Sequence, residues 1–204
     1  MSVRRIPELL PAVLIVIAAV PALGQVTYSG EQGRLPFAAG PGISSYDVDW
    51  GHGRIWGGTA WADWGLTWGP NWMQGFGLEG EARYINLGHS PGQPPLKVGT
   101  AGGGPIYTWR HFQKFRPYGK FLMSYGSLSG FSFPTEPGSP PYTHDTRTAF
   151  APGGGLEFRL TKHVWLRVDY EYQFWMRLFL NHQTYDPQGF TMGAMYNLRD
   201  FHRH

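Results

Sequence analysis

The sequence predicts an all-β fold, an eight-stranded antiparallel transmembrane β-barrel that follows a cleaved N-terminal signal peptide. Residues 164–177 alternate strictly between apolar and polar side chains, which is typical of a strand with two different faces. About eight such segments follow one another, each roughly ten residues or longer, whereas strands of soluble proteins average about five or six residues and strands that cross a bilayer need about nine to eleven. Glycine (29 residues), proline (17) and aromatic residues (16%) are abundant, a composition that favours strands and turns over packed helices.

The N-terminus has the parts of a secretory signal peptide. A basic start precedes an uninterrupted apolar core (12–20), and small residues precede a cleavage site before Gln25. Pro11 and Pro21 limit the apolar core, which is too short for a helix that needs ~20 residues to span a membrane. We therefore expect a signal peptide (1–24), a short lead-in (25–36), the barrel (37–201) and a polar tail (202–204).

Composition argues against other classes of protein. With 17 Lys and Arg against 14 Asp and Glu, the formal charge of +3 is too small to favour nucleic acid as a partner. Cysteine is absent, so the chain can have neither a disulfide framework nor a lipid-modified N-terminal cysteine. An exported chain without either must gain its stability in another way, and a closed barrel is one.

Four alternating segments form the first half of the predicted barrel. The first, 37–47, is interrupted by a Gly-Pro-Gly sequence. The second, 54–68, alternates small and aromatic residues with polar ones, and the Gly-Pro-Asn sequence after it predicts a tight turn. The third, 75–87, alternates charged with apolar side chains, and the fourth, 97–110, alternates less regularly.

Four further segments complete the barrel. Residues 118–127 form the fifth predicted strand, and the connection 128–145 contains four prolines that no regular element is expected to continue through. Residues 147–160 and 164–177 are separated by a short turn, which predicts a tight hairpin. Residues 189–201 close the chain with apolar side chains at every second position.

The connections alternate in length. Those at 69–72, 111–116 and 161–163 are short, while those after residues 87, 127 and 177 are long. Outer-membrane barrels have this asymmetry, with short periplasmic turns and longer external loops. The prediction is therefore an outer-membrane barrel with both termini in the periplasm.

Aromatic residues near the predicted turns and loops suggest two girdles at the membrane surfaces. The expected girdle residues are Trp56, Trp64, Trp68, Trp109, Tyr170 and Tyr172. Trp165 and Trp175 lie near the same levels but have inward parity in the predicted register. Either they plug the ends of the barrel or the register shifts there.

Charged residues on the predicted inner face should form an ion-pair network. An eight-stranded barrel is just wide enough to be filled by side chains, and an unpaired buried ion costs several kcal/mol. The expected members are Glu79, Glu81, Arg83, Lys120, Arg147, Glu157, Arg159, Arg167, Asp169, Glu171 and Arg177, whose charges nearly cancel. Dense pairing, for example between Glu81 and Lys120, would disfavour the alternative of a gated pathway for ions or solutes.

Five segments carry a family resemblance: FGLEGEARYINL (76–87), Gly104-Pro105 with Tyr107, RPYGK (116–120), APGGGLEFRL (151–160) and LRVDYEYQFW (166–175). They resemble small bacterial outer-membrane β-barrel proteins, the broad family that includes the transmembrane domain of OmpA. The last strand, with Thr191, Gly193, Tyr196 and Leu198, is similar to the barrel-assembly signal of such proteins, although polar residues follow the terminal aromatic Phe201. The peptidoglycan-binding domain of full-length OmpA relatives is missing from the pattern, so no cell-wall tether is expected.

The resemblance implies a location in the outer membrane of the Gram-negative cell envelope, among lipid and lipopolysaccharide. It also implies the barrel-assembly machinery and periplasmic chaperones as partners during biogenesis. It implies little about biochemical activity.

Three features suggest other activities but lack their context. Gly75, Gly77 and Gly80 match a dinucleotide-binding pattern, yet strand-like alternation rather than a helix follows them. The histidines at 89, 144 and 182 share no metal-ligand spacing. A lipid A-modifying enzyme could use His89 with Ser90 or His144 with Asp145, but adjacent strand residues point to opposite faces.

We therefore expect a structural or surface-interaction protein with a largely plugged lumen, without catalytic residues, cofactor or metal. Phe131, Phe133 and Tyr142, among the prolines of 128–145, are the expected external contact residues. A narrow, porin-like channel is the main alternative. A lipid A-modifying enzyme and a soluble periplasmic ligand-binding barrel are further ones.

Overall fold

The computed structural model describes residues 37–48, 53–66, 70, 72–87, 96–112, 114–133, 142–161, 163–178 and 183–198. The expected signal peptide, lead-in and polar tail lie outside these residues. In the described part of the chain, no helix is long and apolar enough to cross a membrane.

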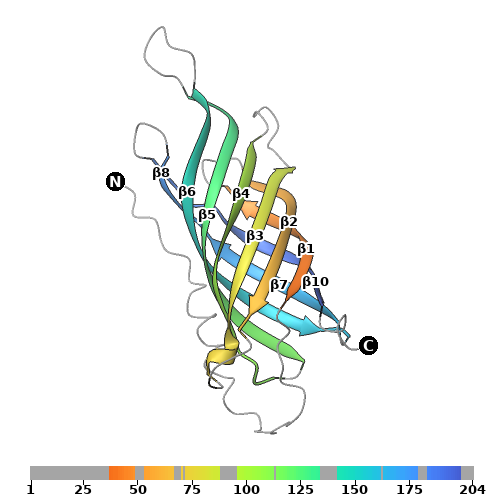
Figure 1. Cartoon of the computed structure of the whole chain (residues 1–204). Coiled ribbons are helices and arrows are strands. Elements are labelled where there is room, and N and C mark those ends of the chain that lie inside the picture. Colours follow the sequence, from red (N-terminus) through yellow and green to blue (C-terminus); the bar gives the residue numbers. More distant parts are fainter. Residues whose placement is uncertain are drawn as a thin grey trace, which may run out of the picture. The chain divides into compact units, whose positions relative to one another are not determined.

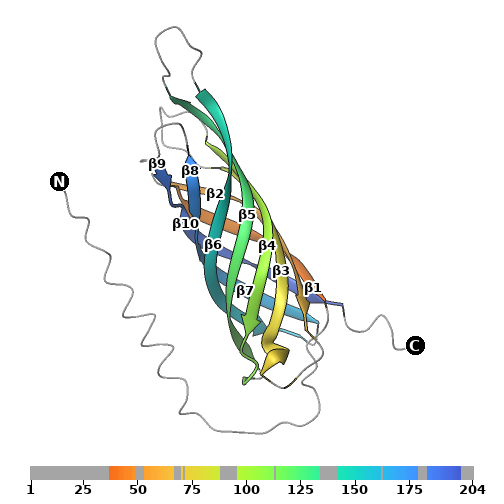
Figure 2. The same ribbon diagram turned by 60° about the vertical axis from the view of Figure 1, so that its left-hand side comes forward.

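The described residues form a closed antiparallel β-barrel with eight wall positions (Figures 1 and 2). A short 3-10 helix, η2 (Met73–Gly75), precedes β3. The strands are β1 (Ala38–Asp47), β2 (Arg54–Gly65), β3 (Phe76–Leu87), β4 (Lys97–Thr108), β5 (Phe115–Phe133), β6 (Tyr142–Arg159), β7 (Val164–Tyr172), β8 (Phe174–Leu178), β9 (Gln183–Tyr185) and β10 (Gln188–Asn197). Neighbours pair in the order β5-β4-β3-β2-β1-β10-β7-β6, and the pairing of β5 with β6 closes the wall, which confirms the predicted fold class.

The long strand expected at 164–177 is interrupted at Gln173. The pairings of β6 with β7 and with β8 keep one register, so β8 continues β7 along the same wall position. In this register Pro152 of β6 lies opposite Tyr172, and the amide of Gln173 donates to the carbonyl of Pro187 at 2.9 Å. Proline has no N–H group, so the backbone on each side of Gln173 lacks one hydrogen-bond donor for the strand pairing. Pro152 of β6 and Pro187, which directly precedes β10, therefore split a segment whose own sequence alternates without a break.

The hairpin of β5 and β6 is longer than expected. The prediction ended the fifth strand at residue 127 and resumed at 147, but β5 continues to Phe133 and β6 begins at Tyr142. The prolines of the connection all lie between these two residues and outside the described part of the chain. The ladder shifts register between Ser129 and Phe133, next to Gly130, whose φ of 94° is open to glycine. The hairpin rises beyond the other strands in both views (Figures 1 and 2).

Alternation along the strands separates an apolar outer surface from a filled interior. The exposed outer residues include Ile43, Trp64, Leu78, Met123, Tyr125, Leu156, Val168 and Met192. The interior has an apolar cluster at each end. We call them the loop-end cluster (Tyr46, Val48, Ile55, Ile85, Leu96, Val98, Leu128, Ala149, Trp175 and Tyr185) and the turn-end cluster (Ala38, Trp61, Trp165 and Met195). Charged and polar side chains occupy the interior between them.

Candidate functional site

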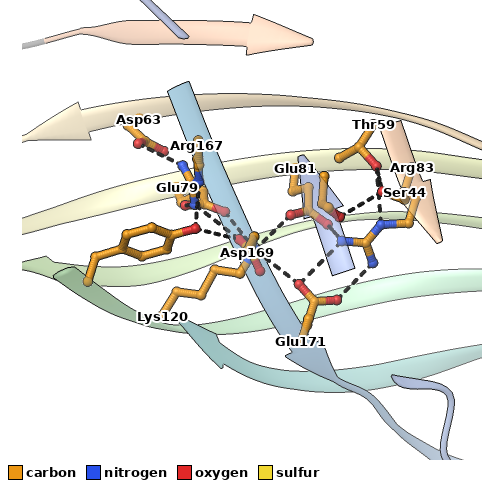
Figure 3. A network of polar contacts seen from close by, with 12 residues as sticks. Ser44, Thr59, Asp63, Glu79, Glu81, Arg83, Lys120, Arg167, Asp169 and Glu171 are labelled. Carbon is orange, nitrogen blue, oxygen red and sulfur yellow. Dashed lines mark hydrogen bonds and ion pairs between the residues drawn. The ribbon is translucent and has the colours of Figure 1, made fainter. Parts of the chain in front are cut away.

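The ammonium group of Lys120 is the centre of the polar interior (Figure 3). It lies close to one oxygen from each of four carboxylates: Glu79 (3.1 Å), Glu81 (2.8 Å), Asp169 (2.7 Å) and Glu171 (3.1 Å). The lysine side chain is fully buried. Two of the carboxylates come from β3 and two from β7, which have three wall positions between them on either side. Lys120, on β5, therefore ties together opposite sides of the barrel.

Arg167 extends from β7 and organises the part of the network nearer the short turns. Its Nη2 pairs with Glu79 and lies 3.4 Å from Asp169, while Nη1 donates to Asp63 at 3.1 Å. Its Nε donates to the hydroxyl of Tyr118 at 2.8 Å, and that hydroxyl donates to Asp169 at 2.8 Å. The guanidinium also lies over the Tyr118 ring, 4.3 Å from its centroid. The Arg167 guanidinium thus donates to acceptors on β2, β3, β5 and β7 and lies over an aromatic ring of β5.

Arg83 makes corresponding ion pairs and a ring contact nearer the long loops. It pairs with Glu81 and with Glu171, the latter at 2.8 Å, and lies 4.3 Å from the centroid of the Tyr46 ring. The Tyr46 hydroxyl donates to Glu171 at 3.1 Å. A chain of hydroxyl groups continues from here, because Arg83 Nε bonds Thr59, Thr59 bonds Ser44, and Ser44 bonds Thr191. The network therefore reaches β1, β2 and β10 as well (Figure 3).

The network contains more carboxylates than cations. Five acidic side chains, Asp63, Glu79, Glu81, Asp169 and Glu171, surround three basic ones, Arg83, Lys120 and Arg167. Oxygens of Glu79, Glu81 and Asp169 lie within 4.8 Å of one another, a spacing that could hold a cation. The Lys120 ammonium contacts all three. A tethered cation therefore occupies the position that this spacing would offer to an ion.

Trp175 connects the loop-end cluster to the charged network. Its indole Nε1 donates to Gln173 at 2.9 Å, and the Gln173 amide donates to Glu171 at 2.7 Å. The Trp175 ring meets the Tyr185 ring edge-on at 5.3 Å between centroids. A Cβ added at Gly126 would overlap the indole, so the indole fits only against a glycine. The expected inward parity of Trp175 is its actual orientation.

Trp165 closes the opposite end. It is buried beside Trp61, Ala38 and Met195, and the guanidinium of Arg116 lies 4.0 Å from its ring centroid. Of the two alternatives for Trp165 and Trp175, the structure has both rings inside the barrel ends.

The structure brings most of the expected lumen residues together: Glu79, Glu81, Arg83, Lys120, Arg167, Asp169 and Glu171. Arg147 does not join them. Its side chain is 43% exposed and lies 3.3 Å from Asp145. Glu157 and Arg159 lie near the short turns, where Arg159 Nε donates to the Thr161 carbonyl at 3.3 Å. The side chain of Arg177 lies outside the described residues.

Asp63 is the ion-pair member that sequence reasoning missed. It pairs with Arg167 at 3.1 Å and is buried. The signal was available, because Asp63 shares inward parity with Thr59 and Trp61. Gln173 and the two tyrosines of the network were also missed, since their sequence positions show burial but not their partners.

Most of the expected girdle residues are exposed on the outer surface. Trp56, Trp64, Trp109 and Tyr170 are exposed there, Tyr172 is half-buried, and Trp68 lies outside the described residues. The backbones of Phe131, Phe133 and Tyr142 lie in β5 and β6 rather than in a loop, and their side chains are outside the description.

The motifs for other activities do not form sites in the described residues. Gly77 and Gly80 lie in β3 and no helix follows them. His144 is exposed whereas Asp145 is buried, and Asp145 bonds Arg147 and the amide of Thr146. His89, Ser90 and His182 lie outside the described residues.

A family model decides what kind of barrel this is. The model of the outer membrane protein beta-barrel domain matches residues 10–197. The chain belongs to this outer-membrane barrel family. The resemblance to small outer-membrane barrels is thereby confirmed, and so is the location in the outer membrane, where the barrel is surrounded by lipid and lipopolysaccharide.

The chain was also compared with solved structures of outer-membrane barrel proteins. The chain is similar to Neisserial surface protein A (TM-score 0.62, 12% identity, 80% of this chain and 97% of that one). It is also similar to OprG of Pseudomonas aeruginosa (TM-score 0.52, 12% identity, 81% and 97%) and to Ail, the attachment invasion locus protein of Yersinia pestis (TM-score 0.46, 18% identity, 78% and 95%). No curated protein matches the sequence. By the loop rule of outer-membrane barrels, the short turns face the periplasm and the β5–β6 hairpin faces outward.

Proposed function

We propose that this outer-membrane barrel has a structural or surface-interaction role, without catalysis, and that its lumen is a plug rather than a pathway. The observation that carries the proposal is the position of Lys120 between Glu79 and Glu81 on one side of the barrel and Asp169 and Glu171 on the other. Breaking a buried ion pair leaves an uncompensated charge and costs about 3–5 kcal/mol. A conducting lumen would need several such pairs to separate, and it would also need Trp165 and Trp175 to leave the two ends.

Electrical recording tests the plug. The refolded chain, inserted into a planar bilayer with its strand content confirmed by circular dichroism, is expected to give no discrete current steps. A matched measurement on the Arg147→Gln variant, altered outside the network, should be equally silent. Discrete steps from the unmodified chain would overturn the proposal.

The runner-up is a narrow cation pathway, favoured by the carboxylate spacing around Lys120. If the ammonium can swing away, the oxygens of Glu79, Glu81 and Asp169 would face a passing cation. This alternative predicts steps in the unmodified barrel whose size changes in the Glu81→Gln and Lys120→Met variants. Steps that neither variant changes would place conduction outside the network.

The β5–β6 hairpin is the segment proposed for surface contacts, because it extends beyond the wall to Phe133 and Tyr142. Its described outer residues are mostly polar, with Thr143, His144 and Thr148 exposed. Membrane lipid and lipopolysaccharide surround the barrel below it. Assembly machinery and periplasmic chaperones remain proposed partners of biogenesis.

A further inference from the structure

The two tryptophans that close the lumen are carried by different kinds of strand. Trp165 lies within β7, which pairs on both sides at this level, with Met195 of β10 and with Arg159 of β6. Trp175 lies on the five-residue strand β8, which pairs with β6 at two positions in the described part of the chain. On its other side β8 pairs with β9, and β9 has no further partner strand there. The outer tryptophan is therefore held by a small unit beside the continuous wall.

We call β8 and β9 together the outer flap, which lies at the end from which the β5–β6 hairpin rises (Figure 2). The flap begins after Gln173 and ends before Asp186 and Pro187. The amide of Gln173 donates to the carbonyl of Pro187 at 2.9 Å, so the two ends of the flap meet at one level. Pro152 and Pro187 lack the N–H groups that would continue the ladder beside Gln173. A unit attached along such a line can turn about it as one body.

The flap carries two buried rings into the external end of the lumen. Trp175 and Tyr185 are both buried, and their rings meet edge-on. The indole lies against Gly126 of β5, where a Cβ would overlap it. Two residues along the same face of β5, the buried Ser124 separates Gly126 from the level of Lys120. The indole thus covers the charged network on the side of the long loops.

We propose that the outer flap is a lid, which turns about Gln173 and Pro187 and closes the external end of the lumen. Turning lifts the indole of Trp175 from Gly126 and lets water and small solutes reach the charged network from outside the cell. The opposite end stays closed during this motion, because Trp165 is held within the paired wall. The lumen then opens as a pocket and not as a pathway. This inference goes beyond the proposed plug, since it concerns the motion of one end and not conduction through both.

Thiol labelling tests the lid, because the chain has no cysteine of its own. Ser124→Cys places a thiol of similar size beneath the indole, at a buried position. The variant is folded in nanodiscs and treated with a small charged methanethiosulfonate reagent, and mass spectrometry measures the rate of modification. We expect the thiol to react fully while circular dichroism shows an intact barrel. Met195→Cys, buried beside Trp165 at the closed end, should react at least about tenfold more slowly, because its exposure requires the wall to open.

A disulfide bond tests the hinge. Phe150 of β6 and Phe174 of β8 are directly opposite each other, and facing residues of antiparallel strands lie at distances that a disulfide can span. The oxidised Phe150→Cys/Phe174→Cys pair should slow modification of the Ser124→Cys thiol by about tenfold or more, because a buried thiol reacts only through the open state. Phe150→Ser/Phe174→Ser, which removes the same rings without forming a bond, should not slow it.

Gly126→Ala supplies an independent check, because it crowds the indole without changing the flap. It should speed modification of the Ser124→Cys thiol while circular dichroism still shows the barrel. Three results would overturn the proposal: a Ser124→Cys thiol that does not react in the folded barrel, a rate that the disulfide leaves unchanged, or equal rates for Ser124→Cys and Met195→Cys.

Discussion

At the scale of the residue, Lys120 has the largest structural consequence. Its ammonium is shared among carboxylates of β3 and β7, on opposite sides of the barrel. Its removal leaves four acidic groups, already in excess over the remaining arginines, without their common counter-charge. Leaving a buried charge unpaired costs several times more free energy of unfolding than losing an exposed ion pair.

The Lys120→Met variant should therefore lose about 3–5 kcal/mol of unfolding free energy, because methionine keeps much of the volume and none of the charge. Urea unfolding in lipid vesicles, followed by tryptophan fluorescence, measures the loss. Arg147→Gln removes a partly exposed cation from the same face and should cost less than about 1 kcal/mol. Equal losses in the two variants would contradict the central position of Lys120.

Gly126 is a second residue whose replacement has a defined effect. A methyl group here would overlap the indole of Trp175, which also bonds Gln173 and meets Tyr185. Gly126→Ala should cost about 1–3 kcal/mol by overpacking. Gly119, on the same strand, has open space where its Cβ would lie, so Gly119→Ala should change stability by no more than about 0.5 kcal/mol. The same urea titration compares them, and a neutral Gly126→Ala would show that the indole does not seal this end.

At the scale of the element, the alternation of side chains predicted which face of each strand points inward, but it predicted the ends of the strands poorly. Which side chains point inward depends only on parity within one strand, so Glu79, Glu81, Asp169 and Glu171 could be placed from the sequence. Where a strand stops depends on its neighbours. Pro152 and Pro187 interrupt the ladder beside Gln173, and mutual pairing carries β5 and β6 into a segment expected to be a loop. Arg147 was also misplaced, because its parity is inward but its side chain is 43% exposed and lies beside Asp145, outside the network.

The long hairpin makes a prediction about orientation that the absence of cysteine allows to be tested cleanly. In intact cells, a single cysteine introduced as Thr143→Cys should react with a membrane-impermeant maleimide, because this exposed residue of β6 lies at the external end. His111→Cys, exposed at the short turns, should react only after the outer membrane is permeabilised. The reverse labelling pattern would show that the barrel has the opposite orientation in the membrane.

At the scale of the whole molecule, apolar side chains cover the outer surface and charged side chains are buried inside, which is the reverse of a soluble barrel. Leu78, Met123 and Met192 are exposed, while Lys120 and Arg167 are buried. This inversion follows from the solvent, since lipid accepts apolar side chains and a barrel interior of this size accepts paired charges. The sequence could show the inversion because the charges share one parity. It could not show which charges pair, because pairing depends on how the eight strand positions are arranged around the lumen.

Alkaline carbonate should therefore leave the protein in the membrane pellet, and only detergent should release it. The reason is that only lipid or detergent can solvate the apolar outer surface. Fractionation followed by immunoblotting measures this, with a soluble periplasmic protein as the control that must be released. Release of the barrel by carbonate alone would restore the soluble alternative.

The bridge that Lys120 makes between opposite walls also constrains the order of events when the chain folds. Arg83 and Glu171 are 88 residues apart in the sequence, and Tyr118 and Asp169 are 51 apart, so the network forms only after late parts of the chain have arrived. Contacts of such separation are slow to form because loop closure must precede them. Until β7 takes its place, the lysine and the glutamates of β3 remain hydrated. Drying of the lumen is then one cooperative step that coincides with closure of the wall, and a partly assembled barrel stays wet inside.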